Sequence, residues 1–304
     1  MPRTGVYELE IRDAIYRGRE DFVYRVAVGE LPFVTAMYPL GGRERMRAEA
    51  ELDGWNLERE RVRLDTAAAG SAVRETVFEQ RRSEPCPLRF AVGSCRELDE
   101  REPNDTARQS QYLSLPHTIN GRIGTPGDVD VFRFTGTAGK EIVADVVARR
   151  VESPLDSVVK LVDSRGELVA WNDDSVDKQG HLHRGAGAQT HFADSYLRTT
   201  LPRGGAFTVQ LADVRGQGGS AYAYRLRIGR PAPDFRLLVA PCTINVGAGL
   251  AAPVEVHALR RDGFDGPIDI RLVEAPRGFE LQGNRIPSGC EMVRMTLSAP
   301  EEPP

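Results

Sequence analysis

The sequence lacks any stretch of about 18 apolar residues, so no segment is long enough to cross a membrane as a helix. Its opening residues, MPRTGVYELE, lack the apolar core of a secretory signal peptide. The net charge is −4, so the chain lacks the basic surplus with which a general nucleic-acid binder neutralises phosphates. Long amphipathic helical patterns are also missing. These absences argue against a membrane-spanning helix, a nucleic-acid partner and a helical bundle.

Cysteine is scarce, and none of the four cysteines forms a CxxC pair, which argues against a zinc ribbon or a thioredoxin-like site. Cys86 and Cys95 could close a small loop as a disulfide, and Cys242 and Cys290 could bridge one domain. The alternative is four buried thiols. The spacing leaves both alternatives open, because a disulfide depends on a geometry that sequence does not give.

Glycine and proline are abundant instead, with 30 and 20 residues in a chain of 304. This composition is typical of short strands joined by turns. A chain of this length is expected to form two or three domains. We therefore predict an all-β protein of three tandem β-sandwich modules: an immunoglobulin-like module at 30–97, a jelly-roll-like module at 98–230 and a second immunoglobulin-like module at 234–300. The linker PAPD (231–234) contains two prolines and predicts restricted freedom between the last two modules.

An internal repeat supports this division. Residues 5–29 align without a gap to residues 205–229, with six of 25 positions identical. In both copies apolar residues alternate with polar ones, which predicts an antiparallel hairpin around a turn. An isolated hairpin is marginally stable, and only four residues precede the first copy. We therefore expect residues 1–29 to be the C-terminal hairpin of a truncated domain, so the missing signal peptide says little about export.

The middle module contains, in this order, the segments EREPNDT (100–106), INGRIGTPGDVDVFRF (119–134), PLDSVVKLVDSRGELVAWNDD (154–174), ADSYLRTTLPRGGAFTVQLAD (193–213) and YAYRLRI (222–228). Through these segments it resembles the bacterial pre-peptidase C-terminal (PPC) domain family. Residues 30–97 resemble, more weakly, an IPT/TIG-type module, through YPLGG and LDGWNL. The order of modules is similar to that of secreted or surface proteins of planctomycete-type bacteria. The resemblance implies a β-sandwich that is attached to exported peptidases but is not itself a peptidase. It also implies relatives that bind collagen and depend on calcium to do so.

A calcium site is predicted where two acidic segments of this module meet. Pro103 favours an extended chain, so that Glu100, Glu102 and Asn104 line one side and Asp105 follows at the bend. Asp128 and Asp130, two residues apart, share one face of a later strand. The resemblance brings the two segments together. Calcium takes 6–8 oxygen ligands, and two ions would nearly balance five carboxylates. The alternative is an acidic linker in water.

A cluster at 181–195 raises the possibility of an enzyme. It contains His181, His183, His191, Asp194 and Ser195, which suggest either a zinc site or a Ser-His-Asp triad. No GxSxG elbow or HExxH helix accompanies them. We therefore favour an exposed loop in which Asp194 and Ser195 cap the start of a strand.

Three further polar or aromatic groups have ordinary structural explanations. The WNDD segment (171–174) with Asp177 could bind metal, but it is favoured as a turn. Trp171 and Tyr196 could form a sugar-stacking face, but buried packing is favoured. Two arginine pairs, 149–150 and 260–261, are interpreted as solvated strand ends.

The sequence thus predicts a non-catalytic, calcium-stabilised spacer or attachment region of a secreted or cell-envelope protein. Its partners would be neighbouring domains or an extracellular polymer. The second hypothesis is a module that binds polysaccharide or fibrous protein, and the third is a metal-dependent hydrolase that uses the histidine segment.

Overall fold

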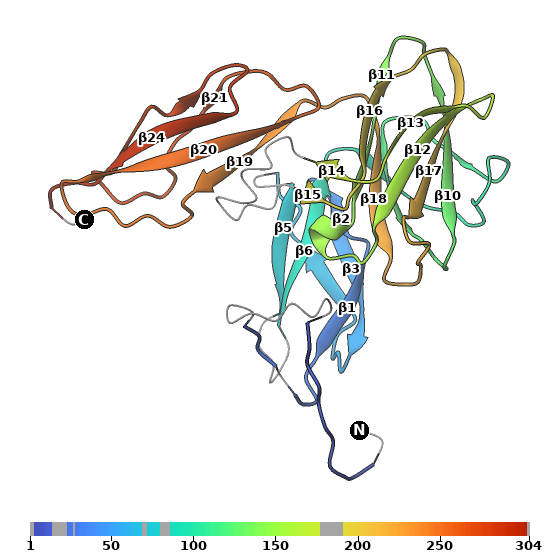
Figure 1. Cartoon of the computed structure of the whole chain (residues 1–304), viewed down its shortest axis with the longest axis horizontal. Coiled ribbons are helices and arrows are strands. Elements are labelled where there is room, and N and C mark those ends of the chain that lie inside the picture. The colour runs from blue at the N-terminus through green and yellow to red at the C-terminus, as the bar shows by residue number, and fades with distance from the viewer. Residues whose placement is uncertain are drawn as a thin grey trace.

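The computed structural model describes residues 3–13, 23–26, 28–68, 72–79, 86–176 and 191–302. These ranges form strands and turns, with a single 3-10 helix, η1 (Arg149–Val151), which confirms the all-β prediction. Nothing helical within them is long and apolar enough to span a membrane. The third unit projects to one side of the other two (Figure 1).

The first unit packs two three-stranded sheets, with strand orders β1-β3-β4 and β2-β6-β5. Alternation explains its core: in β3, Ala50 and Leu52 are buried while Glu49 and Glu51 face solvent. Its strands are β1 (Phe33–Tyr38), β2 (Gly41–Arg43), β3 (Ala48–Trp55), β4 (Arg61–Leu64), β5 (Val73–Phe78) and β6 (Cys86–Gly93).

The middle unit packs two five-stranded sheets around the largest core, with strand orders β13-β12-β17-β10-β8 and β16-β11-β18-β9-β7. A two-stranded ribbon, β14-β15, lies beside them. The strands are β7 (Arg96–Asp99), β8 (Gln111–Tyr112), β9 (His117–Arg122), β10 (Val129–Gly136), β11 (Glu141–Val147), β12 (Ser157–Asp163), β13 (Leu168–Asn172), β14 (Ser175–Val176), β15 (His191–Phe192), β16 (Tyr196–Thr200), β17 (Gly205–Asp213) and β18 (Ala223–Gly229).

The hairpin predicted for residues 205–229 is wrong. β17 and β18 follow one another in the chain but belong to opposite sheets, and each is a central strand. β17 lies between β10 and β12, and β18 lies between β9 and β11. The alternating pattern identified the inward face of each strand correctly, because both strands point that face into the same core from opposite sides. In the first copy, the described residues of 5–29 hold no strand.

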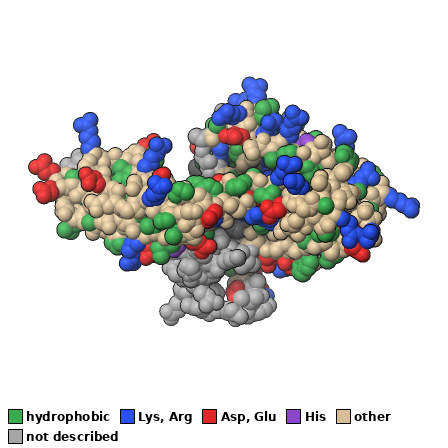
Figure 2. All heavy atoms as spheres, turned by 90° about the horizontal axis from the view of Figure 1, so that it is seen from above, with side chains coloured by type: hydrophobic (Ala, Val, Ile, Leu, Met, Phe, Trp, Pro, Cys, Tyr) green, Lys and Arg blue, Asp and Glu red, His purple; other side chains and the backbone are tan. Residues whose placement is uncertain are grey.

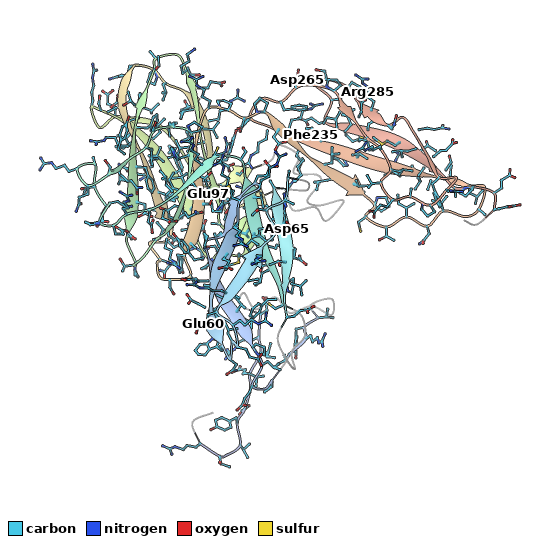
Figure 3. All side chains as sticks on the ribbon, turned by 180° about the vertical axis from the view of Figure 1, so that it is seen from behind. Glu60, Asp65, Glu97, Phe235, Asp265 and Arg285 are labelled. Atoms are coloured by element: carbon cyan, nitrogen blue, oxygen red, sulfur yellow. The ribbon has the colours of Figure 1, made fainter. Side chains whose placement is uncertain are left out.

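The third unit has its own small core between a four-stranded sheet, β19-β20-β24-β22, and a two-stranded sheet, β21-β23. Asp265 and Arg285 lie well away from the first unit in Figure 3. The strands are β19 (Asp234–Ala240), β20 (Ala251–Arg261), β21 (Ile268–Asp269), β22 (Glu280–Gln282), β23 (Arg285–Ile286) and β24 (Met292–Ser298).

The first and middle units share a continuous junction. Val151 and Ala223 of the middle unit complete the first unit's core. Arg225 on β18, almost fully buried, donates to Glu97 at 2.6 Å and to Asn120 at 2.8 Å, and Glu97 lies at this junction in Figure 3. β7 already begins at Arg96, so the middle sheet takes in residues just before position 98, where we predicted the boundary.

All four cysteines are free thiols, so neither of the two proposed disulfides forms. Cys86 and Cys95 are half-buried, while Cys242 and Cys290 are exposed, which also corrects the alternative of four buried thiols. On the face shown in Figure 2, basic and acidic side chains are interspersed, in keeping with the small net charge.

Candidate metal centre and buried polar networks

Residues 100–104 cross the end of the middle sandwich where the two sheets meet. The Glu100 amide donates to the Asn120 carbonyl at 2.9 Å, which attaches the segment to β9. The Val131 amide donates to the Asn104 carbonyl at 3.0 Å, which attaches it to β10. The backbone therefore brings the 100–105 and 128–130 segments together, as the sequence analysis expected.

An inner pair of carboxyl groups shares one tyrosine. The Tyr224 hydroxyl lies 2.7 Å from Glu100 Oε2 and 2.7 Å from Asp130 Oδ2. A hydroxyl has one proton to donate, so a second proton or a cation is needed to satisfy both carboxyl groups. Burial, followed by the charge of Glu100, raises the pKa of Asp130 to about 9. Burial also raises the pKa of Glu100.

Gly121 makes this close approach possible. A Cβ at this position would lie 2.2 Å from Glu100 Oε2 and 2.3 Å from the Tyr224 hydroxyl. The space beside β9 that a side chain would fill is therefore occupied by the carboxylate–tyrosine pair. Sequence reasoning missed Gly121 and Tyr224. The one signal that could have found the tyrosine is its identity with Tyr24 in the repeat.

An outer group of three acids lies at the same end of the sandwich. One carboxylate oxygen from each of Glu102, Asp105 and Asp128 lies within 4.8 Å of the other two. Burial, with Asp128 and Asp105 adding their charges, raises the pKa of Glu102. Two backbone amides help to orient the group: Asn104 N–H donates to Glu102 at 2.9 Å, and Gly124 N–H donates to Asp128 at 2.6 Å.

Two fully buried side chains at the site carry polar atoms without a hydrogen-bond partner. Both side-chain polar atoms of Asn104 are in this state, as is Oδ1 of Asp130. Buried polar atoms are almost always satisfied, so orphaned atoms call for an explanation such as an ion. Carboxylate and amide oxygens are the donors that Ca²⁺ takes. The donor set fits calcium, with three predicted residues in the outer group, two in the inner pair and Asn104 buried beside them.

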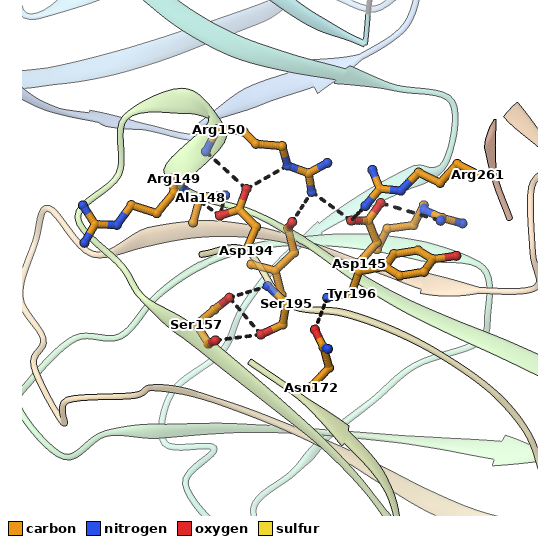
Figure 4. Close-up of polar contacts among 12 residues, drawn as sticks. Asp145, Ala148, Arg149, Arg150, Ser157, Asn172, Asp194, Ser195, Tyr196 and Arg261 are labelled. Atoms are coloured by element: carbon orange, nitrogen blue, oxygen red, sulfur yellow. Dashed lines mark hydrogen bonds and ion pairs between the residues drawn. The ribbon is translucent and has the colours of Figure 1, made fainter. Parts of the chain in front are cut away.

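The polar residues at 194–195 form a different network, shown in Figure 4, and it is structural. Asp194 is fully buried and accepts from the amides of Ala148, Arg149 and Arg150 at 3.1, 2.6 and 3.2 Å, where η1 begins. The Arg150 side chain also donates to it at 2.7 Å. The prediction of an exposed position for Asp194 is therefore wrong, as is that of a solvated Arg150.

Ser195 is held in a way that does not suit a nucleophile. Its hydroxyl is fully buried, donates to the Ser157 carbonyl at 2.7 Å, and lies 3.0 Å from the Ser157 hydroxyl. His181 and His183 lie outside the described residues, as does Asp177. In the WNDD segment, the Asn172 side-chain oxygen accepts from the Tyr196 amide at 2.8 Å, so it links β13 to β16.

A third polar group joins the middle and third units. Asp262 is buried and accepts from the Tyr196 hydroxyl at 2.5 Å, the Arg227 side chain at 2.8 Å and the Ala232 amide at 2.7 Å. Arg261 donates to Asp145 at 2.9 Å and stacks on the Tyr196 ring. Arg261 and Tyr196 are thus interface residues, whereas Trp171, predicted to be buried, is 56% exposed.

Burial by itself would raise the pKa of Asp145. Three guanidinium groups, those of Arg261, Arg150 and Arg227, outweigh burial and lower it to about 2. Asp145 is therefore ionised at neutral pH and connects the η1 network to the third unit.

Comparison with known proteins gives limited matches. No family model matches the chain. An 81-residue stretch is 42% identical to a probable subtilase-type serine protease of Deinococcus radiodurans, and it covers 26% of this chain and 11% of that protein. The fold search finds the pre-peptidase C-terminal domain of a collagenase from Bacillus anthracis, with a TM-score of 0.27 and 15% identity over 42% of this chain and 99% of that domain. The chain thus spans about a tenth of the length of the curated relative that it matches.

Proposed function

We propose that this chain is a non-catalytic accessory region of a secreted or cell-envelope protein, and that calcium stabilises its middle unit. The observation that carries the proposal is the paired carboxyl groups around Tyr224, next to orphaned polar atoms of Asn104 and Asp130. The stretch that is similar to a probable subtilase-type protease supports an association with an exported peptidase. In that setting the region would act as a spacer beside a neighbouring module or as an attachment region for it.

Electrostatics gives calcium a direct effect on stability. Without a cation, burial raises the pKa values of Glu100, Glu102 and Asp130, and repulsion from neighbouring carboxylates adds to the effect. One Ca²⁺ would leave a charge excess of −3 on five ionised carboxylates, and two would leave −1. We therefore propose two ions, one near the outer group and one near Asn104 and Asp130.

The experiment is thermal unfolding of the full chain in saturating calcium and in EGTA. A ligand that binds only the folded state stabilises it by about 2.7 kcal/mol at a hundred times its Kd. We expect a clear rise in Tm with calcium, and a much smaller rise in a variant that combines Asp105→Ala with Asp128→Ala.

The matched control combines Glu49→Ala with Asp53→Ala, two exposed acids on β3 of the first unit. This control should keep the full calcium response. An unchanged Tm in the wild-type chain, or an equal response in both double variants, would refute the calcium site.

Exposed aromatic surface favours a second candidate function, the binding of an extracellular polymer. Trp171 is 56% exposed on β13, an edge strand of the middle unit. Such an indole face can stack on a sugar ring or pack on a fibrous protein. The test is a glycan and fibrous-protein array with the wild-type chain and Trp171→Ala. Binding that the substitution abolishes would support this function, and an array without any signal would oppose it.

A further inference from the structure

The N-terminal segment exposes its apolar side chains although their spacing is that of core strands. Figure 1 shows the segment extending away from the first unit. Six large side chains at alternate positions are between 45% and 73% exposed. Apolar residues this exposed on a segment with period-two alternation indicate a missing partner surface. These six are Tyr7, Leu9, Ile11, Tyr24, Val26 and Val28.

The same chain shows what covers such a segment. The repeat aligns the six exposed residues with six residues of β17 and β18, each of which is at most 1% exposed in the core of the middle unit. The two glutamates between the first three align with outward positions: Glu8 and Glu10 correspond to Thr208 and Gln210, which are only half-buried. The buried counterparts, in order, are Phe207, Val209, Leu211, Tyr224, Leu226 and Ile228.

The pairing of β17 and β18 defines the surroundings that the segment requires. β17 is bonded on both edges, to β10 over eight residue pairs and to β12 over seven. β18 is bonded to β9 over six pairs and to β11 over five. A segment with this pattern therefore needs four neighbouring strands, two in each of two facing sheets. Within the described residues, 5–13, 23–26 and 28 belong to no sheet.

We infer that residues 5–13 and 23–28 are the last two strands of a second sandwich of the middle-unit type, and that polypeptide outside residues 30–304 completes it. Its partner is a β-sandwich with one central strand missing from each sheet. Strand addition of this kind draws affinity from main-chain hydrogen bonds and specificity from alternate side chains. Tyr24 occupies the position of Tyr224, so the partner is expected to present a carboxyl group to its hydroxyl.

The test places the segment in the surroundings that the inference assigns to it. In the full chain, residues 205–229 are replaced by the sequence of residues 5–29. Ala223 and Arg227 are kept because they contact the first and third units, and Gly216 and Gly219 are kept because their φ angles of +65° and +145° disfavour a side chain. We expect this chimera to melt cooperatively, within about 10 °C of the wild-type chain.

Two variants of the chimera serve as a matched pair. In the first, the transplanted segment carries Leu9→Asp and Val26→Asp, which place charges in the core. In the second it carries Glu8→Asp and Glu10→Asp, which place the same residue on the outward face. The inward pair should lower Tm by at least about 10 °C relative to the outward pair. A chimera that is no more stable than its inward variant would overturn the inference.

Hydrogen exchange on the unmodified chain tests the source of the partner. Amides of residues 5–13 and 23–28 should exchange within about tenfold of the rates of an unstructured peptide. Strong protection in the isolated chain would show that residues 30–304 already cover the segment, and would overturn the inference even if the chimera folds.

Discussion

Replacing Asp130 with asparagine should stabilise the calcium-free protein, although Asp130 is fully buried and hydrogen-bonded. The folded-state pKa of about 9 lies above the ordinary value of 3.8, so the carboxyl group of the metal-free folded chain keeps a proton that the unfolded chain has released at neutral pH. The contribution of the Asp130 carboxyl group to the free energy of unfolding is therefore greatest below about pH 4, and this contribution is lost as pH rises from about 4 towards 9. Asparagine is neutral throughout and avoids this loss.

The structure sets the size of the effect. Between 3.8 and 7 lie about three pH units, each of which corresponds to 1.36 kcal/mol, so the loss at pH 7 is at most about 4 kcal/mol. Glu100 shares the proton and reduces this value. The asparagine carbonyl can still accept from Tyr224, and its amide can donate to Glu100, so the hydrogen bonds survive the change.

The assay is urea unfolding of the wild-type chain and Asp130→Asn from pH 4 to pH 9 in EGTA. We expect equal stability near pH 4 and a growing advantage for the variant as pH rises. In saturating calcium the order should reverse, because the variant has lost a negatively charged ligand. Asp53→Asn, an exposed change, should follow the wild-type chain throughout. A variant that is less stable than wild type in EGTA at pH 8 would refute the reasoning.

Three further outcomes are expected. Gly121→Ala should cost about 1–3 kcal/mol, measured by urea unfolding, because its Cβ would lie 2.2 Å from Glu100 Oε2. Gly204→Ala, where the nearest atoms to a Cβ lie at an ordinary 3.8 Å, is the control. Asp262→Ala should remove the acceptor that Tyr196, Arg227 and the Ala232 amide share and release the third unit, seen as a larger radius of gyration in small-angle scattering; an unchanged radius would contradict this. Asp145, whose pKa falls from 3.8 to about 2, contributes about 2 kcal/mol above pH 4 that disappears as pH falls to 2, so acid titration of Asp145→Asn should lack that slope.

Local patterns in the sequence predicted the strands well, because alternation reports which side chains face a core. The pattern in residues 205–229 does not report which of two facing sheets a strand joins. Both answers bury Phe207 and Leu226 equally well, so the predicted hairpin was wrong while the buried face was right.

The same limit applies to the candidate metal centre. The acids of 100–105 and 128–130 are visible in the sequence because they are clustered. Tyr224 lies more than ninety residues further along the chain, and only folding brings it between Glu100 and Asp130. Likewise, Arg150 was interpreted as a solvated strand end, because the neighbouring sequence does not indicate its buried partner Asp194, which lies 44 residues away.

The position of the two chain connections on the middle unit has a mechanical consequence. β7 follows directly from the first unit and β18 leads directly to the third, and Arg96 and Ile228 pair with the same residue, His117, at one end of β9. Along the chain, a pull between the outer units therefore enters and leaves at the same end of one sheet, across a path one strand wide. The acidic site lies at the opposite end of β9, around Gly121 and Arg122, and there Ala223 and the Tyr38 ring tie the sheet to the first unit. A stretching force therefore loads both ends of β9, the His117 end through the chain and the Arg122 end through the packed junction.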